Sequence, residues 1–350
     1  MSEHHLILGG SGFIGRHVGL MLARAGHQVT LADRMRPAYE FPPDVAGRIA
    51  WTKLELGSAD WDRLVEDASV VHHYAWGSVP ASANSNPAGD LITNVAPTLG
   101  LLEALRRRGD GRVVFSSSGG TVYGELRETP VREDHPLVPV TAYGAGKATA
   151  EIYLSLYRAM HGIDCRIARI ANPYGAGQDP AGGLGAVTTF LYNALTGQSI
   201  EIWGTGEVVR DYVHIADVAA CLVTLARAPR TDEAFIFNIG SGTGTSLNEI
   251  VAELESSLNR KLEIRRTEMR AFDIPVSVLS IDRARKILGW APKLSLADGI
   301  KLTFADLAKK AAFSTLDGLQ HPSELYEGLA DSVMQSDKMT ASGRSKRRTS

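Results

Sequence analysis

Short apolar runs alternate with longer amphipathic stretches along the first half of the chain. Two segments, 97–108 and 143–160, have the length and pattern of helices, and the first ends in three arginines before a glycine, a common helix C-terminus. Strands that alternate with helices form parallel sheets, so we predict an α/β fold with a doubly wound parallel sheet. Five apolar runs have the length of its buried strands: residues 5–8, 28–32, 67–75, 111–115 and 164–170.

Beyond residue 171 the predicted elements become shorter and more mixed. We predict a first domain over residues 1–171, to which part of the later chain returns. Residues 172–313 would form mainly a smaller C-terminal α/β lobe, and residues 314–350 an extension whose polar, basic end is disordered. The elements expected in this half are strands at 234–239 and 261–266 and helices at 246–258 and 295–312.

Composition and charge exclude several classes of protein. The chain has 350 residues, 44% of them hydrophobic, which is enough for a large core. A net charge of −2 gives no field that would attract nucleic acid or an anionic membrane, and we predict a plain solvated tail for the basic C-terminus. Cys165 and Cys221 lie far apart in apolar surroundings, which favours core residues over a disulfide or a metal site, and no metal is predicted. Without a basic leader or a run of about 18 apolar residues, we expect a soluble cytoplasmic protein with no membrane segment.

The glycines after the first apolar run indicate a dinucleotide site. Gly9, Gly12 and Gly15 follow a predicted strand and open a predicted helix, with Phe13 and Ile14 between the last two. Such glycines let the backbone approach a pyrophosphate at a helix N-terminus. The second predicted strand ends at Asp33, whose carboxylate can accept both ribose hydroxyls and would repel a 2′-phosphate. We therefore predict NAD rather than NADP, although the neighbouring Arg34 weakens that preference.

A tyrosine and a lysine four residues apart begin the helical segment at 143. Tyr143 and Lys147 share one helix face, so the phenol and the ammonium can converge. The ammonium should favour the phenolate, which could then take a proton from a sugar or alcohol hydroxyl. The spacing alone also fits an exposed pair on a helix, and the glycine turn is what favours catalysis.

Together these motifs resemble those of the extended short-chain dehydrogenase/reductases, and most closely the UDP-glucose 4-epimerase group of nucleotide-sugar epimerases. The similarity covers about residues 5–310 and implies a Rossmann-type NAD-binding first domain with a substrate-binding second lobe. It rests on the glycine turn with Asp33, on Tyr143-x-x-x-Lys147, and on further motifs in the same order: Val122-Tyr123-Gly124, Arg169 to Gly175, Arg210 to Val218, and Ala284 to Trp290.

The resemblance implies a catalytic triad. Tyr143 would be the base, Lys147 would bind the nicotinamide ribose and lower the tyrosine pKa, and Ser118 would hydrogen-bond the reacting hydroxyl. The serine run has one residue more than usual before Val122. Ser118 is therefore our choice, and Ser117 and Thr121 stay open as alternatives.

The resemblance also implies residues that bind substrate and cofactor. Asn172, Arg210 and Arg270 would hold the substrate diphosphate, although surface ion pairing is the simpler interpretation of both arginines. Ser277, seven residues after Arg270, would line the sugar 2-substituent, and its small size predicts that N-acetylated sugars are accepted. Glu55 and Leu56 would face the adenine. Trp203 lies near the expected uridine pocket, but ordinary packing explains it equally well.

These assignments predict NAD-dependent 4-epimerisation of a UDP-hexose through a 4-keto sugar. A 4,6-dehydratase is disfavoured because Gly120-Thr121 replaces the Asp-Glu that elimination needs, and a decarboxylase because the loop 175–183 offers no cation to a sugar carboxylate. A 4-keto reductase and a non-catalytic NAD-binding scaffold stay open. By resemblance we expect a homodimer that pairs through the helices at 97–108 and 143–160.

Overall fold

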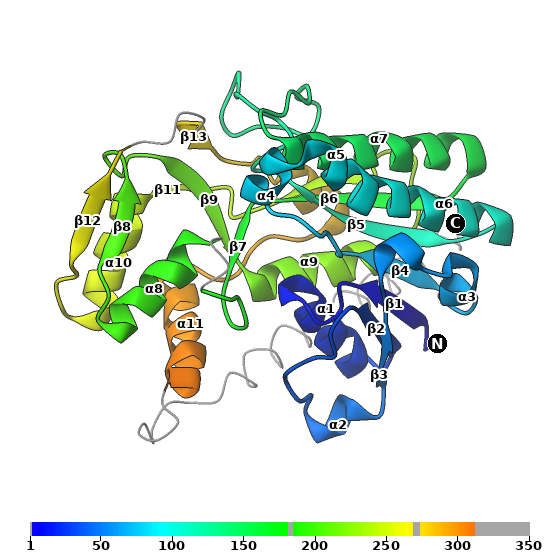
Figure 1. Ribbon diagram of the computed structural model, residues 1–350, viewed down its shortest axis with the longest axis horizontal. Helices are drawn as coiled ribbons and strands as arrows, with labels where there is room; N and C mark the ends of the chain where they lie inside the picture. Colours follow the sequence, from blue (N-terminus) through cyan, green and yellow to red (C-terminus); the bar gives the residue numbers. More distant parts are fainter. Residues whose placement is uncertain (1, 181–184, 269–273, 312–350) are drawn as a thin grey trace, which may run out of the picture.

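The computed structural model describes residues 2–180, 185–268 and 274–311. Within these residues, seven parallel strands form the central sheet in the order β10-β6-β5-β4-β1-β2-β3 (Figure 1). The predicted Rossmann-type doubly wound sheet is confirmed. Its strands are β1 (His4–Leu8), β2 (Gln28–Asp33), β3 (Ile49–Lys53), β4 (Val70–His73), β5 (Arg112–Ser118), β6 (Asp164–Ile170) and β10 (Ile236–Ile239).

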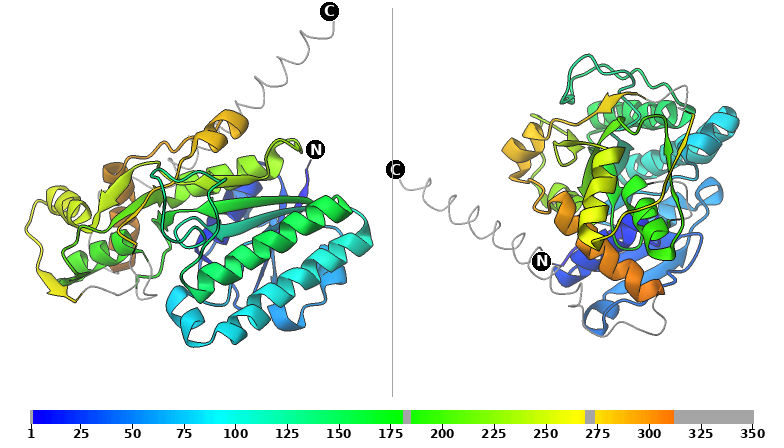
Figure 2. Two further views of the ribbon diagram at one scale, coloured as in Figure 1. Left: turned by 90° about the horizontal axis from the view of Figure 1, so that it is seen from above. Right: turned by 90° about the vertical axis from the view of Figure 1, so that its left-hand side faces the viewer.

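Helices cover both faces of this sheet. One face carries α1 (Phe13–Arg24) and α9 (Ile215–Arg227), and the other carries α3 (Trp61–Val65), α6 (Ala96–Arg108) and α7 (Ala142–His161), the last two lying side by side (Figure 2). Strand β1 contributes to both layers: Ile7 belongs to the core under α1 and α9, and Leu6 and Leu8 to the core under α6 and α7. Burial on two faces explains why the strands are continuously apolar rather than alternating.

A smaller lobe with its own apolar core lies at one end of the molecule (Figure 1). In it, β9 (Val209–His214) pairs with β7 (Asn172–Tyr174), β11 (Gly244–Ser246) and β13 (Val276–Ser277). A second small sheet joins β8 (Ile200–Trp203) to β12 (Ile264–Thr267). The helices of this lobe are α8 (Ala186–Thr196), α10 (Leu247–Leu258) and α11 (Leu296–Ala311).

The remaining short elements lie in the connections. They are η1 (Leu56–Ser58), α2 (Pro43–Ala46), α4 (Pro80–Ser85), α5 (Pro87–Asp90) and two π-helical turns, η2 (Leu91–Val95) and η3 (Ala284–Leu288).

Two strands differ from their predicted bounds in ways that matter for the site. The run at 67–75 contains only the four-residue β4, because the chain then turns and both Tyr74 and Ala75 donate their N–H to Leu8 O. Strand β5 is longer than the predicted 111–115 and includes the serine run, since Ser118 still pairs with Ile170 of β6. The predicted extension at 314–350 lies outside the described residues. Of the helices described, none is long and apolar enough to cross a bilayer.

Candidate active site

The turn between β1 and α1 is packed so tightly that two of its glycines have no substitute. Gly9 has a φ of 79°, and a Cβ there would lie 2.7 Å from Ala75 N. A Cβ on Gly15 would overlap Gly9 O. The first turn of α1, all of whose residues are described, has neither a side-chain cap nor an acidic residue. Its N–H groups therefore remain available to an anion, as a pyrophosphate requires.

The carboxylate of Asp33 is held beside this turn. One oxygen accepts from the N–H of Ser11 at 3.0 Å and the other from the N–H of Arg34 at 2.7 Å, while the side chain stays partly exposed. Backbone donors thus fix an anionic acceptor next to the glycines. This arrangement fits a dinucleotide with free ribose hydroxyls.

The other predicted cofactor residues surround the turn less directly. Phe13 and Ile14 are partly buried and pack on the core, so they anchor α1. Arg34 and Glu55 are exposed, and Leu56 packs partly against the core under α6. Nothing in these contacts assigns Glu55 a ligand.

Tyr143 and Lys147 lie on the first two turns of α7, where Thr141 caps the helix by accepting from Gly144 N at 3.1 Å. Lys147 is buried, donates from Nζ to Ser116 O at 2.7 Å, and lies 4.0 Å from the centre of the Trp76 ring and 5.8 Å from that of Tyr143. The lysine is therefore fixed from the strand side, with its charge beside three aromatic rings, the third being Phe115 at 4.8 Å.

Burial dominates the titration of both groups. It lowers the pKa of Lys147 to about 7, against the opposing attraction of Asp90 and Glu151. It raises the pKa of Tyr143 to about 12, and the charge of Asp90 adds to the rise. Burial therefore opposes formation of the phenolate in the protein alone, and the lowering of the tyrosine pKa by the lysine stays a prediction.

Three candidate hydroxyls, two in the serine run and one at Thr121, have different surroundings. Ser117 is buried and donates to Glu151, so its hydroxyl is already used. Ser118 ends β5 and is partly exposed. The hydroxyl of Thr121 is buried without a hydrogen-bond partner in the part of the chain that is described. Ser118 stays our choice for the third catalytic group, with Thr121 the remaining alternative.

Asp90 is a residue of this site that the sequence reasoning missed. Its side chain is only 4% exposed; Oδ1 accepts from Asn94 Nδ2 at 2.9 Å and from Ser78, while Oδ2 has no partner among the described residues. A Cβ on Gly146 would lie 2.5 Å from Oδ2, so this carboxylate lies against α7 between Tyr143 and Lys147. In the sequence Asp90 looks like any acidic residue near a helix end, and no motif distinguishes it.

A saturated polar network supports α7 from behind. Glu151, one turn beyond Lys147, is 2% exposed and forms an ion pair with Arg169 of β6 at 2.6 Å. Arg169 also donates to Tyr123 Oη and to Glu133 O, both at 2.9 Å. These bonds fix the helix to strand β6, and therefore fix the position of Tyr143 relative to the sheet.

The small lobe brings three of the four predicted substrate residues together around β9. Asn172 begins β7 and donates to Asp211 O at 3.0 Å. Arg210 is opposite Ser277 in the β9–β13 register, is partly exposed, and donates to Ile274 O at 2.6 Å. Ser277 is buried. Arg270 lies outside the described residues.

Strand β6 connects this group to the end of β5 that carries Ser118. Ser118 is opposite Ile170 at the end of β6, and Asn172 opens β7 two residues later. A Cβ on Gly119 would overlap Leu279, two residues beyond Ser277. Trp203, in contrast, ends β8 and donates to Glu201 at 2.9 Å, a contact that fits its packing interpretation.

Comparison with known proteins decides the family. Residues 5–240 match the profile of the NAD dependent epimerase/dehydratase family. The chain belongs to this family. A putative UDP-glucose 4-epimerase of Methanocaldococcus jannaschii is 33% identical over 298 residues, covering 85% of this chain and 95% of the relative.

Other members extend the comparison to structure and to a second activity. The crystal structure of the Thermotoga maritima UDP-glucose 4-epimerase with UDP-glucose superposes with a TM-score of 0.81 at 31% identity, covering 88% of this chain and 99% of that one. A dTDP-4-dehydro-6-deoxyglucose reductase of Escherichia coli is 32% identical over 306 residues, covering 84% and 94%. Family membership, with the glycine cradle and Asp33, identifies NAD as the cofactor class.

Proposed function

We propose that this protein is an NAD-dependent epimerase that inverts C4 of a UDP-hexose. The observation that carries the proposal is the convergence of Tyr143 and Lys147 on one face of α7 with the end of β5, next to the β7–β9–β13 group that contains Asn172 and Arg210. The proposed acid–base groups on α7 would thereby lie near the proposed diphosphate residues on β7 and β9, which follow strand β6 in the chain.

The cofactor would be held by the backbone of Gly9, Gly12 and Gly15 and by Asp33. Bound NAD supplies a hydride acceptor for C4 of the sugar and a positive charge that favours the phenolate of Tyr143. Tyr143 takes the proton of the 4-hydroxyl and later returns one, Ser118 hydrogen-bonds that hydroxyl, and Lys147 holds its proton near the tyrosine. Because the redox change is internal, no external reductant is consumed.

The residues that bind the substrate diphosphate would lie apart from the reacting sugar. Asn172 and Arg210 would hold the diphosphate, with Arg270 as a third group, since a guanidinium presents paired donors to phosphate oxygens. Because these residues would hold only the nucleotide part of the substrate, the 4-keto sugar could turn over and present its other face. Ser277 beside Arg210 leaves room for a 2-acetamido group, so we propose that N-acetylated UDP-hexoses are accepted.

Product analysis tests this function. Purified protein is incubated with UDP-galactose and separately with UDP-N-acetylgalactosamine, without added reductant, and the products are separated by chromatography. Appearance of the gluco epimers supports epimerisation, and absence of any epimer from both substrates contradicts it. Ser277→Tyr should reduce turnover of the N-acetylated substrate more than that of UDP-galactose, and Ser277→Thr is the matched control.

The second candidate is a nucleotide-sugar 4-keto reductase, favoured by the similarity to the dTDP-4-dehydro-6-deoxyglucose reductase. It would use the same tyrosine and lysine. Stoichiometric loss of NADH absorbance with a 4-keto sugar, and no epimer formation without reductant, would support this alternative over the first.

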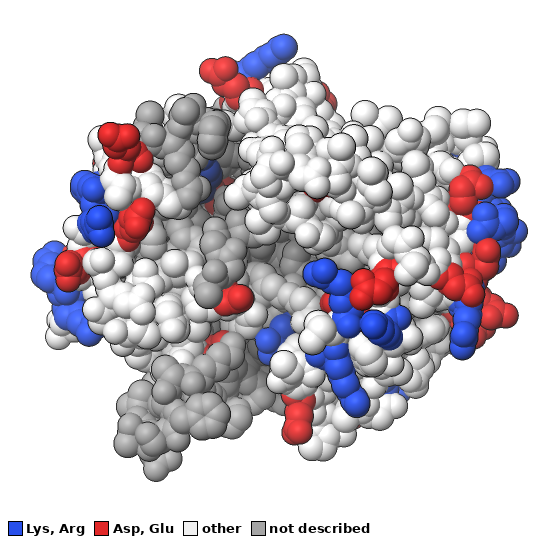
Figure 3. Space-filling model, in the orientation of Figure 1, with Lys and Arg blue, Asp and Glu red and all other residues white. Residues whose placement is uncertain are grey.

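We also propose that the protein acts as a homodimer in the cytoplasm, with α6 and α7 at the dimer interface. Ile152, Leu156 and Met160 recur every four residues along α7 and are 62%, 42% and 66% exposed. The surface over this region carries few charged side chains, whereas charged side chains gather at the right-hand edge and below the centre of the view (Figure 3). Leu156→Glu should give a monomer in size-exclusion chromatography with light scattering, and an unchanged mass would contradict this interface.

A further inference from the structure

The two carboxylate oxygens of Asp90, the last residue of α5, have different surroundings. Oδ1 accepts from Asn94 Nδ2 at 2.9 Å and from the hydroxyl of Ser78. Oδ1 of Asn94 accepts in turn from the N–H of Gly77 at 2.6 Å, so these bonds hold the chain segment that follows β4. Oδ2 of Asp90 is buried without a hydrogen bond in the described chain and lies against α7. One oxygen therefore anchors a loop, and the other carries charge that no donor satisfies.

The glycine at position 146 lets this carboxylate approach α7 closely. A Cβ on Gly146 would lie 2.5 Å from Asp90 Oδ2 and 3.2 Å from Cζ2 of Trp76. Gly146 lies within α7 and has no positive φ, so its backbone conformation does not require glycine. Glycine is less favourable than alanine inside a helix. The close approach of Asp90 and Trp76 is thus the physical reason for glycine at this position.

The indole of Trp76 links the carboxylate to Lys147. Its edge lies beside the point that Asp90 Oδ2 approaches, and the ammonium of Lys147 lies 4.0 Å from the centre of the same ring. The lysine is only 3% exposed, and the one hydrogen bond of Nζ within the described chain goes to Ser116 O. A buried ammonium with one carbonyl and aromatic rings around it requires a counter-charge.

The groups that can titrate around Lys147 come from three elements. Tyr143 and Glu151 lie on α7 itself, Asp90 on α5 and His73 on β4. Burial lowers the pKa of His73 to about 3, so this ring is neutral near pH 7. Burial raises the pKa of Tyr143 to about 12, so the phenol is neutral as well. The two carboxylates are therefore the possible counter-charges among the described residues.

Only one of these two carboxylates still lacks a cation of its own. Glu151 is paired with Arg169, which donates from Nε and Nη2 to its oxygens at 2.6–3.1 Å. Asp90 forms no ion pair with any described residue. The two donors to its Oδ1 favour the ionised carboxylate.

We propose that Asp90 is a positioning residue that supplies the counter-charge of the Lys147 ammonium across Gly146. The pairing rests on these contacts alone, whereas its consequence for catalysis rests on the proposed function. Opposite charges in a buried site stabilise each other's ionised forms, so Asp90 keeps the lysine charged beside Tyr143. Burial lowers the pKa of Lys147 to about 7, and the attraction of Asp90 opposes this fall more strongly than that of Glu151.

Titration of the lysine by nuclear magnetic resonance tests the pairing. The full chain is labelled with ¹³C at lysine Cε and studied with NAD bound and without sugar, and Lys147→Met identifies the signal. In Asp90→Asn the pKa of Lys147 should fall by about 1 or more. Gly146→Ala keeps both charges but forces them apart, so it should give a smaller fall in the same direction. Ser78→Ala removes one donor to Asp90 and keeps the charge, and as the control it should leave the lysine pKa nearly unchanged.

An equal lysine pKa in the wild type and Asp90→Asn overturns the proposal. Equal falls in Ser78→Ala and Asp90→Asn also overturn it, because the effect would then come from the loop and not from the charge. Should Asp90→Asn fail to fold, an unchanged pKa in Gly146→Ala has the same meaning. The titration needs no substrate, so a protein that turns over no UDP-hexose would contradict the proposed function and leave the test of the pairing intact.

Discussion

At the carboxyl end of the central sheet, buried polar atoms are left without partners, whereas at the amino end most are saturated. Trp76 Nε1, Asp90 Oδ2 and Thr121 Oγ1 lack hydrogen bonds within the described residues. At the opposite end the carboxylate of Asp164 accepts from three arginines, namely Arg112, Arg158 and Arg166. A buried group without a partner costs free energy, so its persistence marks a place where a ligand completes the bonding.

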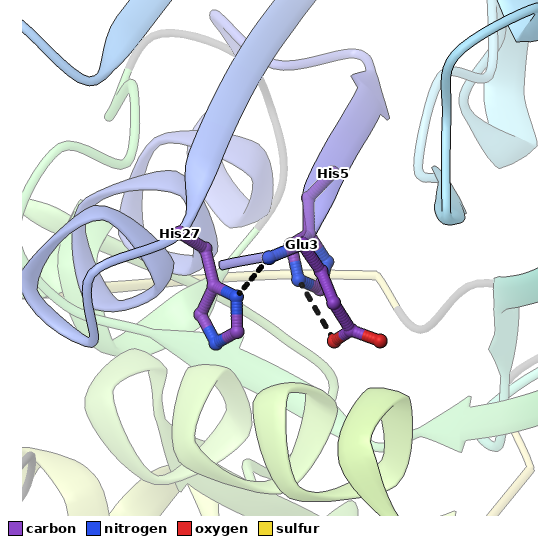
Figure 4. A group of neighbouring side chains, drawn as sticks. All are labelled: Glu3, His5 and His27. Atoms are coloured by element: carbon purple, nitrogen blue, oxygen red, sulfur yellow. Dashed lines mark hydrogen bonds and ion pairs between the residues drawn. The ribbon is translucent and has the colours of Figure 1, made fainter. Parts of the chain in front are cut away.

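The same rule can be applied to the exceptions at the amino end, where a few buried polar atoms also lack partners. Nε2 of His5 (Figure 4) and Nη1 of Arg24, the last residue of α1, are buried without a hydrogen bond within the described chain. The same criterion points to the proposed sugar site at the carboxyl end of the sheet. Substitutions at the two ends should separate catalysis from stability.

Tyr143→Phe should have the largest effect. Phenylalanine fills the same space but cannot transfer a proton, so kcat should fall by about 10³-fold. NAD affinity, measured by calorimetry, should stay within a few-fold of the wild type. A kcat within tenfold of the wild type would assign the proton transfer to another group.

Glu151→Gln should destabilise the fold. Arg169 would be left buried without its counter-charge, which costs about 3 kcal/mol or more. Chemical denaturation followed by circular dichroism measures the change. Asp134→Asn, which removes an exposed pair with Arg132, is the control and should change stability little; similar losses in both variants would contradict the importance of burial.

Asp90→Asn should change the pH dependence of kcat. The carboxylate of Asp90 stabilises the ammonium of Lys147, so removing its charge lowers the lysine pKa further below its value of about 7. The alkaline limb of the profile should then move to lower pH. At pH 8, kcat should fall about tenfold if the lysine pKa drops by about one, because the protonated fraction falls in proportion. An unchanged profile would show that Asp90 only packs. Asp44→Asn, in the short helix α2, is the control.

Glu66→Gln, on the wall of a hollow at the amino end of the sheet, should have the smallest effect. This exposed residue makes no contact with α7 among the contacts described, so kcat/KM should change by less than about twofold. A tenfold loss would mean that the two ends of the sheet are energetically coupled.

Sequence patterns predicted the fold and the glycine turn because both depend on local chemistry. Gly9 and Gly15 signal a close backbone approach that any side chain would block, and the strand–helix alternation follows from burial on two faces. Ser118 could be chosen only by counting, since an extra residue in the run shifts its alignment. Whether the division at residue 171 separates two functional units stays a prediction.

The residues that sequence reasoning missed depend on contacts between distant segments. Asp90 lies against α7 at Gly146, which is more than fifty residues away in the sequence, and no spacing rule connects the two residues. The raised pKa of Tyr143 likewise follows from burial, which the pattern of residues did not reveal.

The single residue between β6 and β7 limits how the protein can move. Strand β6 ends at Ile170 and β7 begins at Asn172, so only one residue joins the sheet that carries Ser118 to the strand that carries Asn172. We expect this short link to keep the distance between Tyr143, the proposed base, and Asn172, a proposed diphosphate residue, nearly constant during turnover. If the protein acts as proposed, we expect the rotation that exposes the second face of the sugar to take place in the substrate itself, about the bonds that join the hexose to its nucleotide.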